Sequence, residues 1–333
     1  MIDMDSLISK FINEEIVLSK KDISASAKSR EWFLGRIKTK IEDDKNNPAL
    51  YGTEPFVNFG SYFKGTKVSD ADEYDILLVF DTNNGQFISG GNKIGEGIGS
   101  ANPNHRYDQK FMKDDGQSLS PGKILSWLRG IAKEVVDEFG GTAPDRAGQA
   151  ITVRIESKDI SIDLVPAGIF SHTQRTGVEF YDIPRGDKDD GWIVTNPKQD
   201  KELLNDLGGK YDNFKNVIRI TKYIKQNYNL TISSFAVECS AISYVQNAAW
   251  YTSVYANLKG FLAQFSEALK AKSVQDIFDT TTNLLSSLSD TNAEQYSRFI
   301  CGINEFLEKI RGLDNEDKAY VCLCNGLGNK KQT

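Results

Sequence analysis

The sequence predicts an α+β protein, in which a mixed β-sheet is followed by a lobe of helices. Two observations support this fold class. Short apolar or alternating runs bounded by turn residues, which are typical of strands, fall before about residue 196. Beyond residue 213, apolar residues recur at the spacing of amphipathic helices. We therefore expect a bilobal chain, with residues 1–195 forming the sheet-containing core and its N-terminal helical brace, and residues 196–333 forming the helical lobe.

Composition and charge exclude several classes of protein. The 333 residues are 39% hydrophobic, which is enough to bury a large core. No run of about 18 apolar residues occurs, and the N-terminus lacks a basic stretch before an apolar core, so we expect a cytoplasmic protein with neither membrane span nor secretory signal. The net charge of −6 argues against binding of duplex DNA, which needs a basic face, but not against nucleotides. The four cysteines are too few and scattered for a disulfide framework.

The expected elements of the first part alternate between helices, loops and strands. In order, they are two helical segments within 5–41, a loop at 43–54, strands at 56–59 and 73–80, a loop at 81–120, a helix at 121–139, a hairpin of strands at 150–156 and 159–166 with a Ser157-Lys158 turn, and a loop at 168–191. The loop at 81–120 is rich in Gly, Asn, Ser and Asp. A loop of this length is either functional, as a lid or product-specificity loop, or a solvated insertion.

The second part is expected to be helical almost throughout. The predicted helices cover 213–228, a buried segment from Ile232 onward, 258–269, 274–288 and 294–310. The segment 325–333 is expected to fray.

The segment from Gly60 to Asp75 carries the residues expected to do chemistry. Gly60-Ser61 places a small residue beside a hydroxyl, which suits a loop whose backbone approaches a ligand closely. Glu73 and Asp75 then begin a strand, and they share one face because side chains alternate along a strand. Two adjacent carboxylates repel each other unless a cation lies between them, and Mg²⁺ is commonly held by one or two carboxylates plus substrate phosphates. The alternative interpretation is a solvated strand edge beside an ordinary turn.

Asp163 is the third candidate metal ligand. It is an isolated aspartate in the apolar strand at 159–166, where burial would be costly without a cation or hydrogen-bond donors. In the functional interpretation, it joins Glu73 and Asp75 in a three-carboxylate site. In the alternative interpretation, it points to solvent.

The order and spacing of these residues resemble a known signature. Gly-Ser-Tyr-Phe at 60–63, Lys-Val-Ser at 67–69, Glu-Tyr-Asp-Ile at 73–76 and Ser-Ile-Asp-Leu-Val-Pro-Ala at 161–167 are similar to motifs of nucleotidyltransferases with a DNA-polymerase-β-like fold. Within that superfamily they resemble the cyclic GMP–AMP synthase branch and its bacterial relatives, the CD-NTases. The resemblance implies a polymerase-β-like core with a mixed sheet, a C-terminal helical lobe and a cleft that holds a nucleoside triphosphate. The animal DNA sensor of this branch has a zinc insertion and a basic surface, and the sequence shows neither.

The resemblance also implies a two-metal phosphoryl transfer. Glu73, Asp75 and Asp163 would hold two Mg²⁺ ions, with Mn²⁺ as the alternative metal. One ion would activate an attacking ribose hydroxyl and the other would steady the β- and γ-phosphates of the donor. Gly60 and Ser61 would bind phosphates from one side, and pyrophosphate would leave.

Further substrate-binding residues follow from the resemblance in the second half of the chain. Lys222, with Ser233 and Ser234 at the next helix start, is similar to the family's lysine and paired serines and would clamp the triphosphate tail, since a helix start favours anions. A lysine on a buried helix otherwise extends to water. Phe235 replaces the family's base-stacking tyrosine and would stack on the base, and a core role is the alternative.

Thr195 and Asn196 resemble the family's polar residues near the base pocket. They would read base edges, or else cap the following helix.

The resemblance to CD-NTases implies the product, a cyclic di- or trinucleotide made from ATP, GTP or other triphosphates. Such a messenger would be made in response to phage, as in CBASS signalling, and would be read by a separate effector protein. Two alternatives are a nucleotidyltransferase that makes a linear oligonucleotide or modifies another acceptor, and a catalytically silent nucleotide-binding relative.

Overall fold

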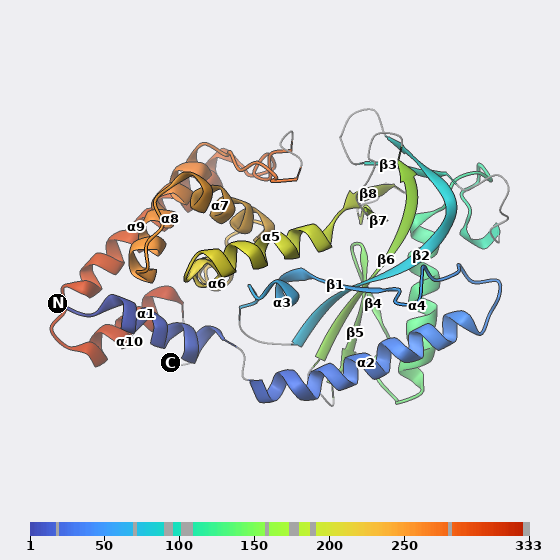
Figure 1. Cartoon of the computed structure of the whole chain (residues 1–333), viewed down its shortest axis with the longest axis horizontal. Coiled ribbons are helices and arrows are strands. Elements are labelled where there is room, and N and C mark those ends of the chain that lie inside the picture. The colour runs from blue at the N-terminus through green and yellow to red at the C-terminus, as the bar shows by residue number, and fades with distance from the viewer. Residues whose placement is uncertain are drawn as a thin grey trace. The chain divides into compact units, whose positions relative to one another are not determined.

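The structure is a computed structural model that describes residues 1–17, 20–68, 72–89, 96–100, 109–156, 160–172, 180–186, 191–278 and 282–328. Contacts divide the chain into two compact units (Figure 1). The sheet unit comprises Ser19–Phe63 and Ala71–Lys201, and the helical unit comprises Met1–Leu18, Lys64–Asp70 and Glu202–Thr333. Residues 1–18 of the predicted N-terminal helical brace therefore belong to the helical unit, and the rest of that brace belongs to the sheet unit.

A mixed eight-stranded sheet forms the centre of the sheet unit. Its strands are β1 (Phe56–Phe59), β2 (Asp72–Ser89), β3 (Glu96–Ser100), β4 (Asp145–Ala147), β5 (Ala150–Ile155), β6 (Ile160–His172), β7 (Tyr181–Pro184) and β8 (Trp192–Thr195), in the order β1-β2-β3-β8-β7-β6-β5-β4. The long strands β2 and β6 also pair with each other, in parallel, and every other pairing is antiparallel. The predicted α+β class with a mixed sheet is confirmed.

Helices α2 (Lys20–Glu42) and α4 (Pro121–Asp137) cover one face of this sheet (Figure 1). Their apolar residues pack on alternate residues of the strands, including Tyr74, Ile76 and Leu78 of β2. Because strand side chains alternate, the intervening residues of β2 belong to the opposite face. Ser120 caps α4 by accepting a hydrogen bond from the Lys123 N–H at 3.3 Å.

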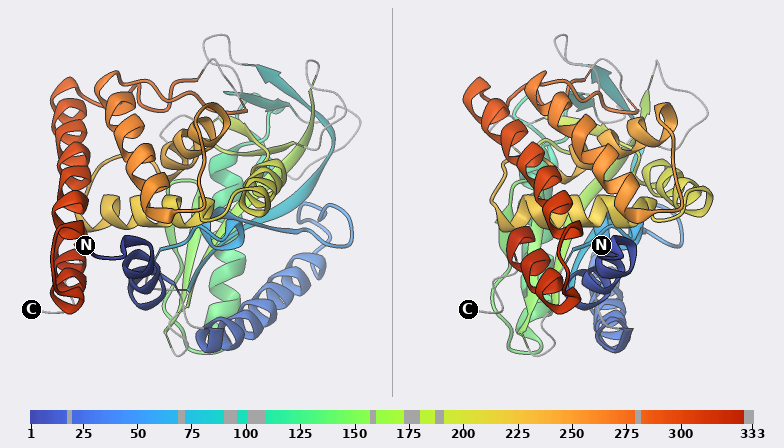
Figure 2. Two further views of the ribbon diagram at one scale, coloured as in Figure 1. Left: turned by 60° about the vertical axis from the view of Figure 1, so that its left-hand side comes forward. Right: turned by 90° about the vertical axis from the view of Figure 1, so that its left-hand side faces the viewer.

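The helical unit buries a separate apolar core. Its helices are α1 (Met4–Phe11), the π turn η1 (Ile12–Ile16), α6 (Phe214–Asn227), α7 (Ser234–Asn247), α8 (Val254–Lys270), α9 (Asp290–Arg311) and α10 (Glu316–Leu327), and α5 (Pro197–Lys210) connects it to β8. Helices α8 and α9 lie side by side, as both views of Figure 2 show. None of the described helices has the length and apolar character needed to cross a membrane.

Four sequence expectations about local structure were wrong. The predicted loop over 81–120 contains the end of β2, all of β3 and a short helix, η2 (Gln109–Phe111), and its remaining residues lie largely outside the described ranges. Asn83 and Asn84 adopt positive φ where the pairing of β2 with β6 changes register, so their turn-like composition reflects an irregularity within a strand. Likewise, the predicted loop at 168–191 contains the end of β6 and all of β7.

The third error concerns the predicted helix at 274–288. The described residues there form turns and a bridge between Gln275 and Asn283. Gly60 also begins the short helix α3 (Gly60–Lys64), where a loop was expected. The turn at Ser157-Lys158 lies outside the described residues.

Candidate active site

The register of β2 and β6 places the three predicted carboxylates on one face of the sheet. Asp75 is the direct parallel partner of Asp163, and Glu73 is the partner of Ser161. Directly paired residues point to the same face, and residues two apart on a strand share it as well. The face is the one opposite to α2 and α4, since Tyr74 packs beneath those helices. Asp75 and Asp163 are half-buried and Glu73 is exposed.

Gly60 lies directly against the carboxylate of Asp75. Residue Phe59, at the end of β1, pairs with Asp75, and the chain then turns at Gly60 with φ +77° into α3. A Cβ atom at Gly60 would lie 1.7 Å from Asp75 Oδ2. Only glycine therefore allows the backbone to approach this carboxylate so closely, and Ser61 follows on the same turn.

Thr152 holds one oxygen of Asp163. It lies on β5 directly opposite Asp163, and its hydroxyl donates to Asp163 Oδ1 at 2.6 Å. This hydrogen bond fixes the orientation of the carboxylate on the shared face. It leaves the other oxygen, Oδ2, as the one not engaged by Thr152.

The donor set suits a hard divalent cation in type, because all three side chains present carboxylate oxygens. Within the described ranges, however, no three His, Cys, Asp or Glu side chains approach closely enough to form a metal-binding group. The backbone thus places the three residues on the same face of the paired strands β2 and β6. With Asp163 held by Thr152, the carboxylates of Glu73 and Asp75 would have to turn toward it for the three to hold a common ion.

Lys222 lies in a buried ion-pair cluster of the helical unit. Its ammonium pairs with Glu238 and donates to Thr66 Oγ1 at 3.0 Å. Lys64 donates to the other oxygen of Glu238 at 2.6 Å, and Thr66 donates to Oε1 at 2.7 Å. Burial alone would raise the pKa of Glu238, but the charges of Lys222 and Lys64 outweigh it and hold the pKa below its ordinary value. Lys222 of α6 and Glu238 of α7 thus hold residues 64–66 in place. The sequence interpretation instead expected Lys222 to extend to a ligand or to water.

Other cations of α6 are better placed for an anion. Lys215 and Arg219 lie over Gly65, with their terminal nitrogens 3.4 and 3.8 Å from where a Cβ of that glycine would be. Lys215 donates a hydrogen bond to the amide oxygen of Asn205 at 2.7 Å, and Arg219 donates one to the amide oxygen of Asn216 at 2.8 Å. Partial burial lowers the pKa of both, and for Lys215 the nearby Arg219 charge adds to this effect. A bound anion would offset the cost of that burial.

The start of α7 matches the expected position of the paired serines. Ser233 caps the helix by accepting from the Ala236 N–H at 3.0 Å, and both serines are exposed. Lys225 Nζ lies 3.4 Å from Ser234 Oγ, and desolvation lowers its pKa. Phe235 is half-buried against the helical core, with Lys64 Nζ 5.8 Å from its ring centre.

Thr195 and Asn196 lie where β8 leads into α5. Asn196 Oδ1 accepts from the Gln199 N–H at 3.1 Å, which is the capping geometry of the alternative interpretation. Thr195 pairs with Tyr181 on β7, so its strand is separated from β6 by one strand.

The Mab-21 protein nucleotidyltransferase domain family matches residues 62–179. A probable cyclic nucleotide synthase of Bacillus cereus (strain VD146) is 27% identical over 258 residues, which are 77% of this chain and 76% of that protein. The chain is a nucleotidyltransferase that is similar to a cyclic nucleotide synthase.

A solved structure supports the fold of this nucleotidyltransferase. The complex of CdnC with HORMA-deltaN from E. coli MS115-1 contains a chain that matches with a TM-score of 0.70, covering 98% of this chain and 97% of that chain. The sequence identity is 11%, so this likeness concerns the fold. The matched family region contains Glu73, Asp75 and Asp163.

Sequence reasoning missed two features of the nucleotidyltransferase. Thr152 could have been found from the sequence. The predicted two-residue turn at Ser157-Lys158 sets the register of the hairpin, and in that register Thr152 is opposite Asp163. The basic face of α6 follows from the helical spacing of Lys215, Arg219 and Lys222. Which of these cations is buried in an ion pair depends on Glu238, which is remote in sequence.

Proposed function

We propose that this nucleotidyltransferase is Mg²⁺-dependent and condenses nucleoside triphosphates into a cyclic di- or trinucleotide, with release of pyrophosphate. The observation that carries the proposal is the register that sets Asp75 beside Asp163, with Glu73 on the same face. The name of the Bacillus cereus relative supports the product class. In each transfer, a ribose hydroxyl oxygen forms a bond to the α-phosphorus of a donor triphosphate, and the bond to the pyrophosphate leaving group breaks.

Glu73, Asp75 and Asp163 are the residues we propose to hold the metal. Bound Mg²⁺ would lower the pKa of the attacking hydroxyl and neutralise charge on the phosphates. Thr152 keeps Asp163 oriented through its 2.6 Å hydrogen bond, so that the free oxygen is presented on the shared face. That oxygen is the one we propose to receive the hydroxyl proton. Gly60 permits the close approach of backbone and Asp75, and Ser61 follows it as the proposed phosphate-binding hydroxyl.

The triphosphate tail is proposed to bind the helical unit through Lys225, Ser233 and Ser234, with Lys215 and Arg219 as further cations. Lys225 and Ser234 are already within 3.4 Å, and exposed hydroxyls at a helix start favour anions. Lys222 contributes indirectly, by anchoring Thr66 to Glu238.

For the base, Phe235 is the proposed stacking surface, because part of its ring remains accessible. Thr195 is proposed to contact base edges. Asn196 would do so only if it released its hydrogen bond to Gln199.

We further propose that the product serves anti-phage signalling and is read by a separate effector protein, without activation by duplex DNA. The resemblance to CD-NTases supports the role in anti-phage signalling and the separate effector. The net charge of −6 supports the proposal that duplex DNA does not activate the enzyme, because binding of duplex DNA needs a basic face.

The test is a product assay with matched variants. Purified protein is incubated with ATP, GTP, CTP, UTP and Mg²⁺, and the products are treated with phosphatase and identified by mass spectrometry. We expect a phosphatase-resistant cyclic product that is lost in Asp75→Asn and Asp163→Asn. Asp145→Asn is the control, because Asp145 is exposed on the same face but lies beyond Thr152. Products that phosphatase degrades would refute cyclisation, and unchanged turnover in Asp75→Asn would refute the site.

A further inference from the structure

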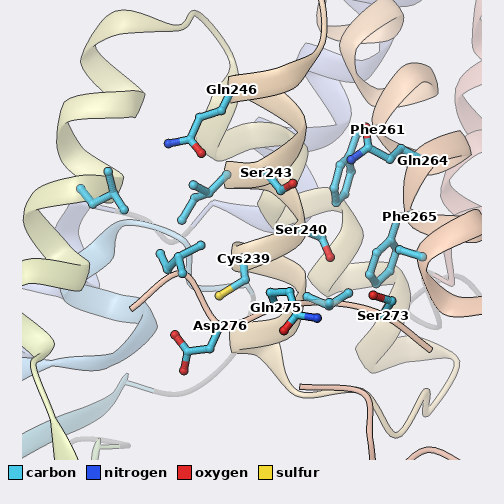
Figure 3. Close-up of a pocket in the computed structure, with 15 residues that line it drawn as sticks. Cys239, Ser240, Ser243, Gln246, Phe261, Gln264, Phe265, Ser273, Gln275 and Asp276 are labelled. Atoms are coloured by element: carbon cyan, nitrogen blue, oxygen red, sulfur yellow. The ribbon is translucent and has the colours of Figure 1, made fainter. Parts of the chain in front are cut away.

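The helical unit contains a cavity that is lined by none of the predicted site residues (Figure 3). Its volume is about 470 Å³. Small-molecule sites commonly measure about 300–1,000 Å³. The lining comes from Leu203 of α5, from 239–246 of α7, from 261–268 of α8 and from the segment 273–277. All of it belongs to the helical unit.

Ser240 provides an unused hydrogen-bonding group in this lining. Its side chain is 7% exposed, and within the described parts of the chain its Oγ has no hydrogen-bond partner. Buried hydroxyls in helices usually donate to the carbonyl one turn earlier, as Thr221 does to Val217 at 2.9 Å. Because buried polar groups are nearly always paired, the free hydroxyl of Ser240 indicates a group that pairs with a bound molecule.

The charge of the lining restricts the chemistry of that molecule. Gln246, Gln264 and Gln275 contribute amides, Ser243 and Ser273 contribute hydroxyls, and Asp276 contributes a carboxylate. No lysine, arginine or histidine is among the lining residues, so nothing there would neutralise a phosphate or carboxylate. Phe261 and Phe265 add aromatic surface.

The segment at 273–277 is fixed in place, although it is not helical. Asn283 Oδ1 accepts from the Val274 N–H at 3.2 Å, and its amide donates to the Lys272 carbonyl at 2.7 Å. The Leu284 N–H donates to the Val274 carbonyl at 2.8 Å. The wall that this segment provides is therefore held by its own hydrogen bonds, which is expected of a preformed site.

We propose that this cavity binds a neutral aromatic molecule that carries an amide or hydroxyl group. The aromatic part packs against Phe261 and Phe265, and the polar part pairs with Ser240 and with the amides of Gln246 and Gln264. Anions of the same shape are disfavoured, because no lysine, arginine or histidine of the lining would compensate for the loss of their hydration. The site is independent of the proposed catalytic function, and α7 contributes to both, because its first turn carries Ser234 and Phe235.

The test compares two probes that differ in charge but not in shape. Binding of 4-hydroxybenzamide and 4-hydroxybenzoate to the full chain is measured by saturation-transfer difference NMR. We expect the amide to bind and the benzoate to bind at least about tenfold more weakly, since the lining has no cation to pair with the buried carboxylate of the benzoate. Equal binding of the two probes, or no binding of the amide, would overturn the proposal.

Two variants locate the bound probe. Ser243 is exposed at the cavity, so Ser243→Trp should block it without disturbing the core. Ala263 is exposed on α8 but does not line the cavity, which makes Ala263→Trp the matched control. The amide signal should disappear in Ser243→Trp and persist in Ala263→Trp. A signal that persists in both variants would place the probe elsewhere and overturn the proposal.

Discussion

Two groups of charged residues, one in each unit, differ in sign and in burial. In the sheet unit, Glu73, Asp75 and Asp163 carry the same charge and share a partly exposed face. In the helical unit, Lys64 and Lys222 both pair with Glu238, and all are less than a tenth exposed. The first group contains only negative charges, which lie on two paired strands. The second group combines two positive charges with one negative charge.

The signs of the neighbouring charges decide which of the two groups is available to bind a ligand. Opposite charges that pair with each other in the interior are not available to a ligand, and removing one partner leaves an uncompensated buried charge. Like charges gathered on one face repel each other, and a bound cation relieves that repulsion. A charged residue in a sequence motif therefore has to be judged by the sign of its neighbours. On that basis Lys222 is an anchor, and the carboxylates are the candidate metal ligands.

The largest expected effect comes from breaking the buried group. Glu238→Gln leaves Lys64 and Lys222 without their carboxylate and should lower the free energy of unfolding by about 3–5 kcal/mol. The exposed bidentate pair of Glu138 with Arg36, at 2.8 and 2.9 Å, is the control, and Glu138→Gln should cost much less. Both are measured by urea unfolding at neutral pH. Equal losses in the two variants would show that the buried cluster is not an anchor.

The same cluster predicts a pH dependence. Because folding depresses the pKa of Glu238, its stabilising contribution is present above the ordinary carboxyl value of 4.5 and is lost as pH falls below it. The stability of the wild type should thus fall more steeply than that of Glu238→Gln in this acidic window. Parallel curves would contradict the assignment.

The next largest effect concerns the approach of Gly60 to Asp75. Gly60 and Gly52 have similar positive φ values of 77° and 65°, so alanine strains the backbone at both. Only at Gly60 would the new Cβ meet a carboxylate, and at Gly52 nothing lies within 4 Å. Displacement of Asp75 should reduce kcat by roughly 10²-fold in Gly60→Ala, with turnover close to wild type in Gly52→Ala. Equal turnover in the two variants would show that the position of Asp75 does not matter for catalysis.

A smaller effect distinguishes the cations of α6. Arg219→Ala removes a partly buried guanidinium, and we expect KM for ATP to rise about tenfold with little change in kcat, because an interaction with the tail holds the substrate and not the reacting atoms. Arg298→Ala is the control, since Arg298 is exposed and pairs with Glu294 on α9. Steady-state kinetics at constant salt measures both. A change confined to kcat would contradict tail binding.

The smallest effect compares a partnered and an unpartnered serine in the helical unit. Ser266 donates to the Ser297 carbonyl at 3.0 Å, so Ser266→Ala should cost about 1 kcal/mol in the free energy of unfolding. Ser240 has no partner among the described residues, so Ser240→Ala should stay within about 0.5 kcal/mol of wild type. If Ser240→Ala were as costly as Ser266→Ala, its hydroxyl would have a partner within the protein.

Much of the sheet unit was predictable, because strand periodicity and short turns fix which residues face each other. The hairpin of β5 and β6 follows from the turn predicted at Ser157-Lys158, and the alternation of β2 separates Tyr74 from Glu73 and Asp75. The parallel pairing of Asp75 with Asp163 joins segments far apart in the chain. That pairing was expected only through the family resemblance.

The remainder depends on tertiary contacts that local patterns do not contain. The helical spacing of apolar residues in 274–288 suggested a helix, but Asn283 binds the backbone of Lys272 and Val274 and favours a bridged turn. Similarly, Lys222 was chosen for its spacing from Ser233, and its partner Glu238 is visible only once α6 and α7 are packed.

The most direct test of the central claim is to locate the metal. A crystal of the full chain with Mn²⁺ and a non-hydrolysable ATP analogue would show the ion by its anomalous scattering. We expect Mn²⁺ on the face of β2 and β6, bound by carboxylate oxygens of Asp75 and Asp163, with Glu73 as the third ligand. Mn²⁺ bound with the triphosphate elsewhere, and contacting neither Asp75 nor Asp163, would contradict the account.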